Sequence, residues 1–103
     1  MTFGSTIADL RKRVGLSQKD LAAKVTKDDG SPISPQYLND IERDRRNPPS
    51  QYLLKQLARE LHTSEDYLSF LAGQFPEDVR IGSHQPERVT AAMQAFRRAL
   101  REG

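Results

Sequence analysis

Hydrophobic residues recur along this chain at the spacing of α-helices rather than in the strict alternation of β-strands. The first stripe steps by four, three and four positions and consists of Phe3, Ile7, Leu10 and Val14. Residues spaced in this way share one face of a helix, and Gly15 is well placed to end it. Similar stripes predict short helices at residues 17–25, 34–42, 51–61 and 64–72. We therefore expect an all-α domain of five short helices.

Hydrogen-bonding side chains stand where these helices should begin. Ser17 is a good N-cap, and Asp20 three residues later can complete a capping box. Ser34 can cap the next helix, with Pro35 at its first position, where a missing N–H costs nothing. In the fourth helix, Tyr52 belongs to a wide apolar face that we expect in the core.

The C-terminal part of the chain predicts one more helix. Residues 75–81 look like a single helical turn that packs back through its apolar residues Phe75, Val79 and Ile81. We assign residues 1–81 to the main domain, 82–86 to a linker and 87–103 to an amphipathic helix. The apolar stripe of this last helix consists of Val89, Met93, Phe96 and Leu100. Such a stripe must be buried, either on its own domain or against a second copy, and we favour the second copy.

The stretch at residues 33–48 has the most distinctive chemistry. Leu38 and Ile41 can pin its helix to a core, while amide and carboxylate side chains point elsewhere. Amides match the major-groove edge of adenine, and guanidinium groups suit phosphate oxygens. The polar and basic residues are Gln36, Asn39, Asp40, Arg43, Arg45, Arg46 and Asn47. Taken alone, the stretch is also consistent with an ordinary surface helix and a solvated charge run.

The segment before this stretch, at residues 16–22, distinguishes a DNA-binding helix from an ordinary surface helix. It is the capped Leu16-Ser-Gln-Lys-Asp-Leu-Ala22, and it is followed by Ser-Pro-Gln-Tyr-Leu-Asn-Asp-Ile-Glu-Arg and Arg-Arg-Asn-Pro. Together the two segments resemble the lambda-repressor-like helix-turn-helix family, also called the xenobiotic-response-element type. The resemblance covers about residues 6–71. It implies a five-helix domain that binds double-stranded DNA, with the helix at residues 34–42 in the major groove. It also implies a structural ion pair between Arg11 and Glu42.

The resemblance assigns roles to individual residues. The expected base-reading residues are Gln36, Tyr37, Asn39 and Asp40. The expected DNA-backbone contacts are Gln18, Lys19, Arg43, Arg45, Arg46 and Asn47. Two features depart from the family pattern: Pro35 stands where a base-reading side chain is frequent, and about six extra residues lie within residues 26–33, around the Asp29-Gly30 turn signal. In this insertion, Lys27 either reaches DNA or belongs to an inert surface loop.

Composition narrows the functional classes. The chain has 103 residues, no cysteine and a net charge of +2, so local charge placement must account for any attraction to a polyanion. We expect no metal site, cofactor or catalytic constellation, no membrane span and no secretory leader, and a reducing cytoplasm fits the lack of cysteine. We expect a cytoplasmic transcription regulator, a repressor acting as a homodimer. The alternative is a protein-interaction module, such as an antitoxin or regulator subunit, whose C-terminal helix holds a regulatory protein partner.

Overall fold

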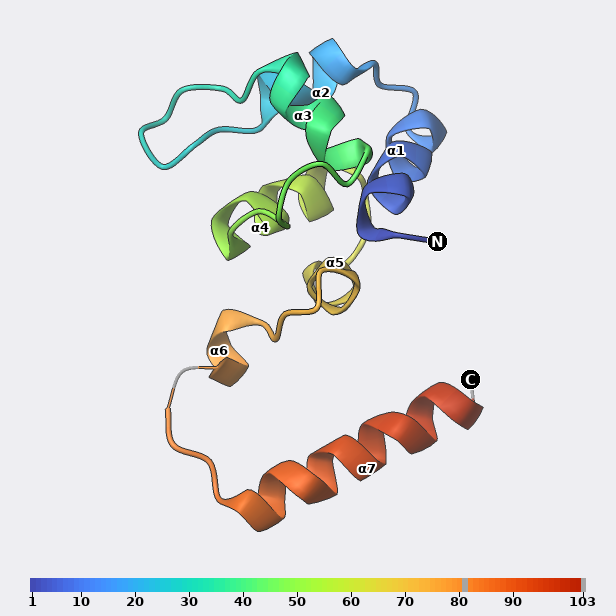
Figure 1. Cartoon of the computed structure of the whole chain (residues 1–103), viewed down its shortest axis with the longest axis vertical. Coiled ribbons are helices and arrows are strands. Elements are labelled where there is room, and N and C mark those ends of the chain that lie inside the picture. Colours follow the sequence, from blue (N-terminus) through green and yellow to red (C-terminus); the bar gives the residue numbers. More distant parts are fainter. Residues whose placement is uncertain (81, 103) are drawn as a thin grey trace.

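The computed structural model describes residues 1–80 and 82–102, which form seven α-helices (Figure 1). The helices are α1 (Phe3–Arg13), α2 (Gln18–Lys24), α3 (Pro35–Glu42), α4 (Gln51–Glu60), α5 (Glu65–Leu71), α6 (Glu77–Arg80) and α7 (Pro86–Glu102). The expectation of an all-α fold with five helices and an added C-terminal helix is confirmed. None of the helices in the described part of the chain is long and apolar enough to cross a membrane.

Each of the first five helices begins directly after a serine or threonine. In every case, the side-chain oxygen accepts a hydrogen bond from the backbone N–H three residues later. These N-caps are Thr2, Ser17, Ser34, Ser50 and Ser64. Asp20 closes the expected capping box at α2. Because a cap satisfies a backbone donor that the helix itself leaves free, these residues fix where the helices start.

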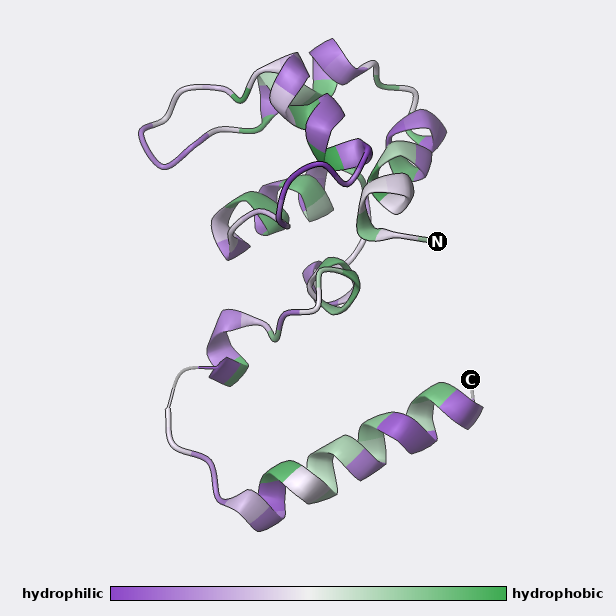
Figure 2. Cartoon of the chain, viewed as in Figure 1, coloured by the Kyte–Doolittle hydropathy of each residue, from purple (hydrophilic) through white to green (hydrophobic). Residues whose placement is uncertain are grey.

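Helices α1 to α5 enclose one hydrophobic core. α3 packs against both α1 and α2, and α4 packs against α5. Each helix contributes residues that are almost fully buried, including Ile7, Leu21, Leu38, Leu54 and Leu68. In contrast to these helices, which carry hydrophobic residues, the turn after α3 is uniformly hydrophilic (Figure 2). The core therefore holds α3 from one side and leaves its other side at the surface.

The expectation that Tyr52 lies in the core is wrong. Tyr52 is 48% exposed, whereas Gln56 on the same helix is buried. Gln56 Nε2 donates to the carbonyl oxygen of Thr26 (2.8 Å), and the Thr26 N–H donates to Gln56 Oε1 (2.8 Å). Backbone groups that leave water need partners, and the Gln56 amide supplies both partners for Thr26. Gln56 thereby pins the base of the 26–33 loop to α4.

The expectation that residues 75–81 pack back on the core is also wrong. Phe75 and Val79 are 55% and 45% exposed, and Ile81 lies outside the described residues. Gly73 ends α5 in a left-handed conformation (φ 73°), and the chain then leaves the five-helix body toward α7. α7 lies at the end of the molecule opposite α3 (Figure 1).

Candidate nucleic-acid interface

The recognition-helix candidate α3 is held by its apolar side. Leu38 is fully buried and Ile41 is 2% exposed. On the other side, Gln36 is exposed, and Tyr37, Asn39 and Asp40 are half-buried. The expected backbone contacts Lys19, Arg43, Arg45, Arg46 and Asn47 are exposed, and Gln18 is half-buried. The structure thus brings most of the predicted interface residues to α3, to the turn that follows it and to the start of α2.

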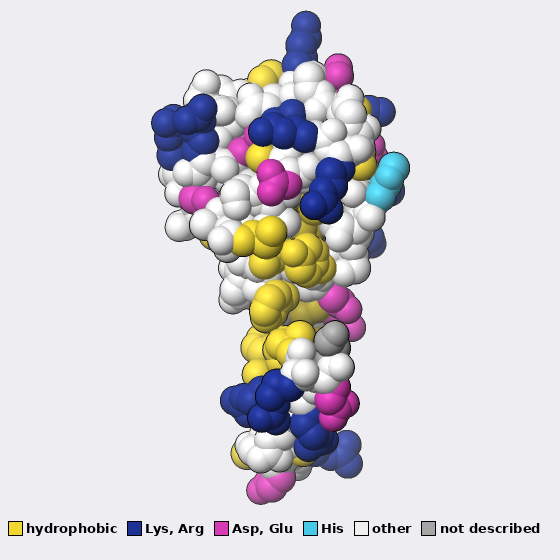
Figure 3. Space-filling view, turned by 90° about the vertical axis from the view of Figure 1, so that its right-hand side faces the viewer, with side chains coloured by type: hydrophobic (Ala, Val, Ile, Leu, Met, Phe, Trp, Pro, Cys, Tyr) yellow, Lys and Arg dark blue, Asp and Glu magenta, His cyan; other side chains and the backbone are white. Residues whose placement is uncertain are grey.

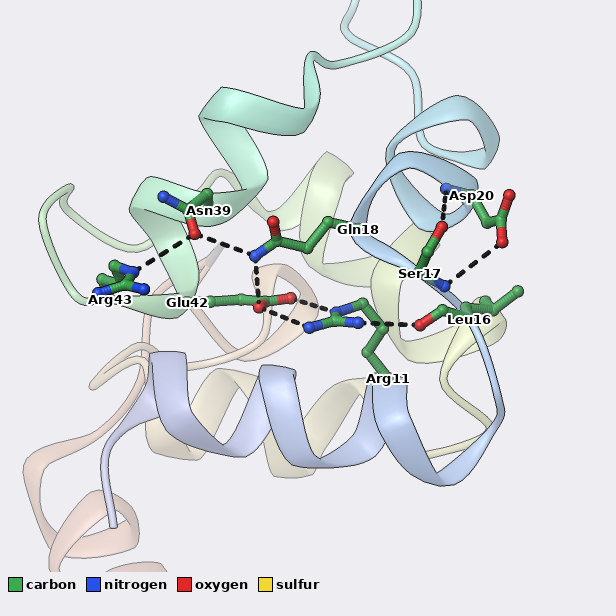
Figure 4. Close-up of polar contacts among 8 residues, drawn as sticks. All are labelled: Arg11, Leu16, Ser17, Gln18, Asp20, Asn39, Glu42 and Arg43. Atoms are coloured by element: carbon green, nitrogen blue, oxygen red, sulfur yellow. Dashed lines mark hydrogen bonds and ion pairs between the residues drawn. The ribbon is translucent and has the colours of Figure 1, made fainter.

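A buried polar network joins α1, α2 and α3 (Figure 4). Arg11 donates to both carboxylate oxygens of Glu42, from Nε at 2.7 Å and from Nη2 at 3.0 Å. Its Nη1 donates to the carbonyl oxygen of Leu16 at 2.9 Å. The hydrogen bond to Glu42, opposed by burial and aided by the opposite charge, raises the pKa of Arg11 above its ordinary value. The pair of residues expected to link α1 to the end of α3 is therefore a bidentate ion pair.

Gln18 and Asn39 belong to the same network. Gln18 Nε2 donates to Glu42 Oε1 (2.9 Å) and to Asn39 Oδ1 (3.1 Å). Arg43 Nε also donates to Asn39 Oδ1, at 3.4 Å. One expected backbone contact and one expected base reader are thus bonded to each other. These bonds link α2 to α3 and hold the amide of Asn39 with its oxygen turned toward Gln18.

A second, more exposed cluster surrounds Asp40. Gln36 Nε2 donates to Asp40 Oδ1 at 3.0 Å. Arg45 Nη1 lies 3.9 Å from Asp40 Oδ1, and Arg46 Nε lies 3.7 Å from Asp40 Oδ2. The guanidinium carbon of Arg46 lies 4.6 Å from the centre of the Tyr37 ring. Asp40 therefore orients Gln36 and partly neutralises two arginines, while both arginine side chains stay more than half exposed.

Sequence reasoning missed the residue that fixes the basic turn. Asp44, between Arg43 and Arg45, adopts a left-handed conformation (φ 56°), which aspartate tolerates better than most residues. Its carboxylate accepts hydrogen bonds from Thr2 Oγ1 (2.5 Å) and from the Gly4 N–H (2.9 Å). These bonds tie the turn to the start of α1. An aspartate inside a run of arginines was the available signal.

The inserted loop at residues 26–33 is ordered by its own hydrogen bonds. The Lys27 N–H donates to the Ser31 carbonyl oxygen at 2.8 Å, and Asp29 Oδ1 accepts from the Ser31 hydroxyl (2.6 Å) and N–H (2.9 Å). These hydrogen bonds from Ser31, the hydroxyl first, lower the pKa of Asp29. Ile33 is 4% exposed and returns the chain to the core before α3. The insertion therefore extends outward from the five-helix body (Figure 1).

The expected dimer contacts lie at the other end of the molecule. Val89, Phe96 and Leu100 are exposed on α7, and Met93 is half-buried. The ring of Phe96 packs against Phe70 of α5, with ring centres 5.9 Å apart.

The fold and this surface define a helix-turn-helix protein, and comparison with known families agrees. A family model described as helix-turn-helix matches residues 7–68. The chain belongs to this family, the lambda-repressor-like helix-turn-helix proteins of the xenobiotic-response-element type, which are DNA-binding regulators rather than enzymes. No curated protein and no solved structure gives a match.

Proposed function

We propose that this protein is a sequence-specific, double-stranded DNA-binding transcription regulator that acts as a repressor by occupying its operator. In this proposal the protein is a homodimer, and each copy places α3 in the major groove of one half of a pseudo-palindromic site. The main support is the position of α3. Its apolar side is fixed by the core, while amide and guanidinium groups of the helix and the next turn face solvent together.

The proposed DNA contacts are of two kinds: contacts that read bases and contacts that position the protein on phosphates. Gln36 is the principal reader, because its amide is oriented by Asp40 and its side chain is exposed. Tyr37, Asn39 and Asp40 form the rest of the reading surface, where Tyr37 packs against a sugar or a thymine methyl group. The phosphate contacts are Gln18, Lys19, Arg43, Arg45, Arg46 and Asn47. Phosphate contacts supply affinity for any sequence, whereas base contacts supply specificity.

A pair of substitutions tests this division. A preferred site is first obtained by selecting bound fragments from a random duplex pool. Arg45→Ala should weaken binding to every duplex and reduce the salt slope by about 0.9 for the lost phosphate contact. Gln36→Ala should cost about 1–3 kcal/mol on the preferred site and little on random DNA. The matched control is Arg98→Ala, which removes an exposed arginine of α7. It should change neither the salt slope nor the affinity for the preferred site.

Two results would contradict the proposal at different levels. If the unmodified protein shows no salt-dependent retention on duplex DNA, the function is wrong. If Gln36→Ala weakens specific and random binding equally, the function stands and the reader is wrongly assigned.

The competing proposal is a module that holds a different protein through α7, and the exposed apolar residues of that helix favour it. Co-purification of another protein that persists after nuclease treatment, without retention on DNA, would select this alternative.

A further inference from the structure

Exposed hydrophobic side chains gather where the five-helix body meets α7 (Figure 3). Six large apolar residues of α5, α6, α7 and the α5–α6 connection are between 42% and 60% exposed. They are Phe70, Phe75, Val79, Val89, Phe96 and Leu100, and we call them the C-terminal apolar surface. An open groove of about 590 Å³ lies within it, lined mainly by α5, α6 and α7. Monomeric proteins rarely leave so many large apolar residues together in contact with water.

Within a single chain, the apolar side of α7 is left largely without packing partners. No residue of this helix is buried, and Met93 is its only half-buried one among the described residues. The Phe70–Phe96 contact is its aromatic anchor on the body. Within residues 1–80 and 82–102, no side-chain hydrogen bond or ion pair joins α7 to α5 or α6. A 17-residue amphipathic helix with so few contacts lacks a partner for its apolar side.

We propose that a second copy of this chain covers the C-terminal apolar surface, with the two α7 helices packed antiparallel across a two-fold axis. The stripe Val89, Met93, Phe96 and Leu100 is spaced four, three and four, so it has the same spacing in both directions. An antiparallel pair therefore sets Val89 against the second copy's Leu100, and Met93 against its Phe96. This self-complementarity is what an isologous interface requires.

The available area fits this occupant. A fully buried aromatic side chain contributes roughly 150–250 Å². Three of the six residues are phenylalanines that are about half exposed, and the three aliphatic residues add smaller areas, so the six together supply roughly 500 Å² of apolar surface in each copy. A standard interface buries about 800 Å² per partner, of which about 55–65% is apolar. The C-terminal apolar surface alone thus meets the apolar share of a stable dimer.

The charges agree with an association of like chains. Helices α5 and α6 carry four acidic residues and one arginine, a net charge of −3, and Asp66 and Asp78 line the groove. α7 carries four arginines and two glutamates, a net charge of +2. The arginines that flank one copy's stripe therefore meet an acidic rim on the assembled dimer.

The position of α7 is also compatible with DNA binding, and this point alone rests on the proposed function. α7 lies at the end of the long axis opposite α3 (Figure 1). We place the two-fold axis of the α7 pair along this long axis, so that the two copies stand side by side with both α3 helices at the same end of the dimer. The molecule measures 45 × 32 × 23 Å. A centre-to-centre separation of one 32 Å width is close to the spacing of about 34 Å between half-sites one DNA turn apart.

The chain has no cysteine, which allows a direct test of the register in the full-length protein without DNA. Val89→Cys and Leu100→Cys are prepared separately, mixed and oxidised. The mixture should give a disulfide-linked dimer, and each variant alone should not. Equivalent positions lie about 16 Å apart along an antiparallel pair, too far for a disulfide. The matched control is a mixture of Ala91→Cys and Arg98→Cys, which have the same sequence symmetry on the opposite side of α7 and should not cross-link.

Sedimentation of the unmodified chain completes the test, with a dimer expected at tens of micromolar. Leu100→Glu should raise the dimer dissociation constant about tenfold or more. A monomer at that concentration overturns the proposal and leaves α7 as a helix that packs only on its own body. Self-cross-linking of Val89→Cys alone, or equal cross-linking of the control pair, overturns the antiparallel arrangement. None of these results depends on DNA. A monomer would remove the homodimer from the proposed function, whereas sequence-specific DNA binding through α3 is tested separately by retention on duplex DNA.

Discussion

The two ends of the molecule differ in which side chains they bury and which they expose. Around α3, charged and amide groups are buried and paired, as in the network of Arg11, Gln18 and Glu42. Around α7, large apolar groups such as Phe75 and Leu100 are exposed instead. Among the described residues, every buried side-chain nitrogen or oxygen has a hydrogen-bond partner. The α3 end is therefore complete within one chain, whereas the α7 end has the composition of an interface.

This difference separates two kinds of specificity. At the α3 end, hydrogen bonds determine which atoms face outward, because Asp40 orients Gln36 and Gln18 orients Asn39. At the α7 end, the exposed side chains are apolar and offer little directional chemistry, so in the proposed dimer shape and hydrophobic area would determine what binds. Substitutions at the first end should change stability and DNA preference, and those at the second should change association.

The largest effect should come from breaking the buried ion pair. Arg11 and Glu42 are each 9% exposed, so removing one partner leaves a buried charge without compensation. Arg11→Ala should destabilise the fold by about 3–5 kcal/mol. For a domain of this size, that lowers the melting temperature by well over 10 °C. Arg98→Ala on α7 is the control, and unchanged melting of Arg11→Ala would falsify the structural role of the pair.

The next effect concerns the close approach of α1 to the end of α3. A Cβ added at Gly4 would lie 2.7 Å from the backbone oxygen of Glu42, and still closer to that of Ile41. Alanine normally favours a helix over glycine by about 1 kcal/mol. Here the clash should reverse the sign, and Gly4→Ala should destabilise by about 1–3 kcal/mol in thermal or denaturant unfolding. Asp9→Ala, exposed on the same helix, should change little, and a stabilised Gly4→Ala protein would show that α1 can move away freely.

The α3 end could be predicted from sequence because its signals are local. A serine cap, Pro35 at the first helical position and the buried spacing of Leu38 and Ile41 each act within one helical turn. The resemblance then supplied the link between Arg11 and Glu42, which are 31 residues apart. No local rule gives that pairing.

Several other features could not be predicted because they depend on long-range contacts. Gln56 is buried where the inserted loop brings Thr26 to it, and no periodicity in α4 announces that contact. The role of Asp44 depends on the start of α1, 40 residues away. Apolar Phe75 and Val79 suggested core packing, but periodicity alone cannot tell whether an apolar residue meets its own core or another surface.

A smaller effect, on DNA affinity, should separate the two roles of Asp40, which are to neutralise arginines and to orient Gln36. Asp40→Asn keeps an oxygen that can accept from Gln36 Nε2 but no longer neutralises Arg45 and Arg46. Exposed ion pairs contribute about 0–1 kcal/mol, so affinity for random duplex DNA should rise by no more than about fivefold. Glu102→Gln on α7 makes the same change in net charge at a distance from α3 and should have less effect in the same fluorescence anisotropy titration. Equal gains for both variants would mean that net charge, rather than the release of these arginines, is responsible.

The smallest effect concerns the inserted loop, which tests whether the hydrogen-bonded order of the α3 end extends to an exposed segment. The Ser31 hydroxyl, and then the Ser31 N–H, hold the pKa of Asp29 below its ordinary value. A group whose folded pKa is lowered stabilises its structure above the unfolded pKa of about 3.9, and this stabilisation is lost as the pH falls through the folded pKa. Ser31→Ala should therefore move the pKa of Asp29 back toward its ordinary value, as measured by titrating the Asp29 carboxyl carbon by NMR. Global unfolding should barely change, because the loop is exposed and Gln56 still pins its base. An unaltered Asp29 titration in Ser31→Ala would mean that the loop's turn does not depend on this side chain.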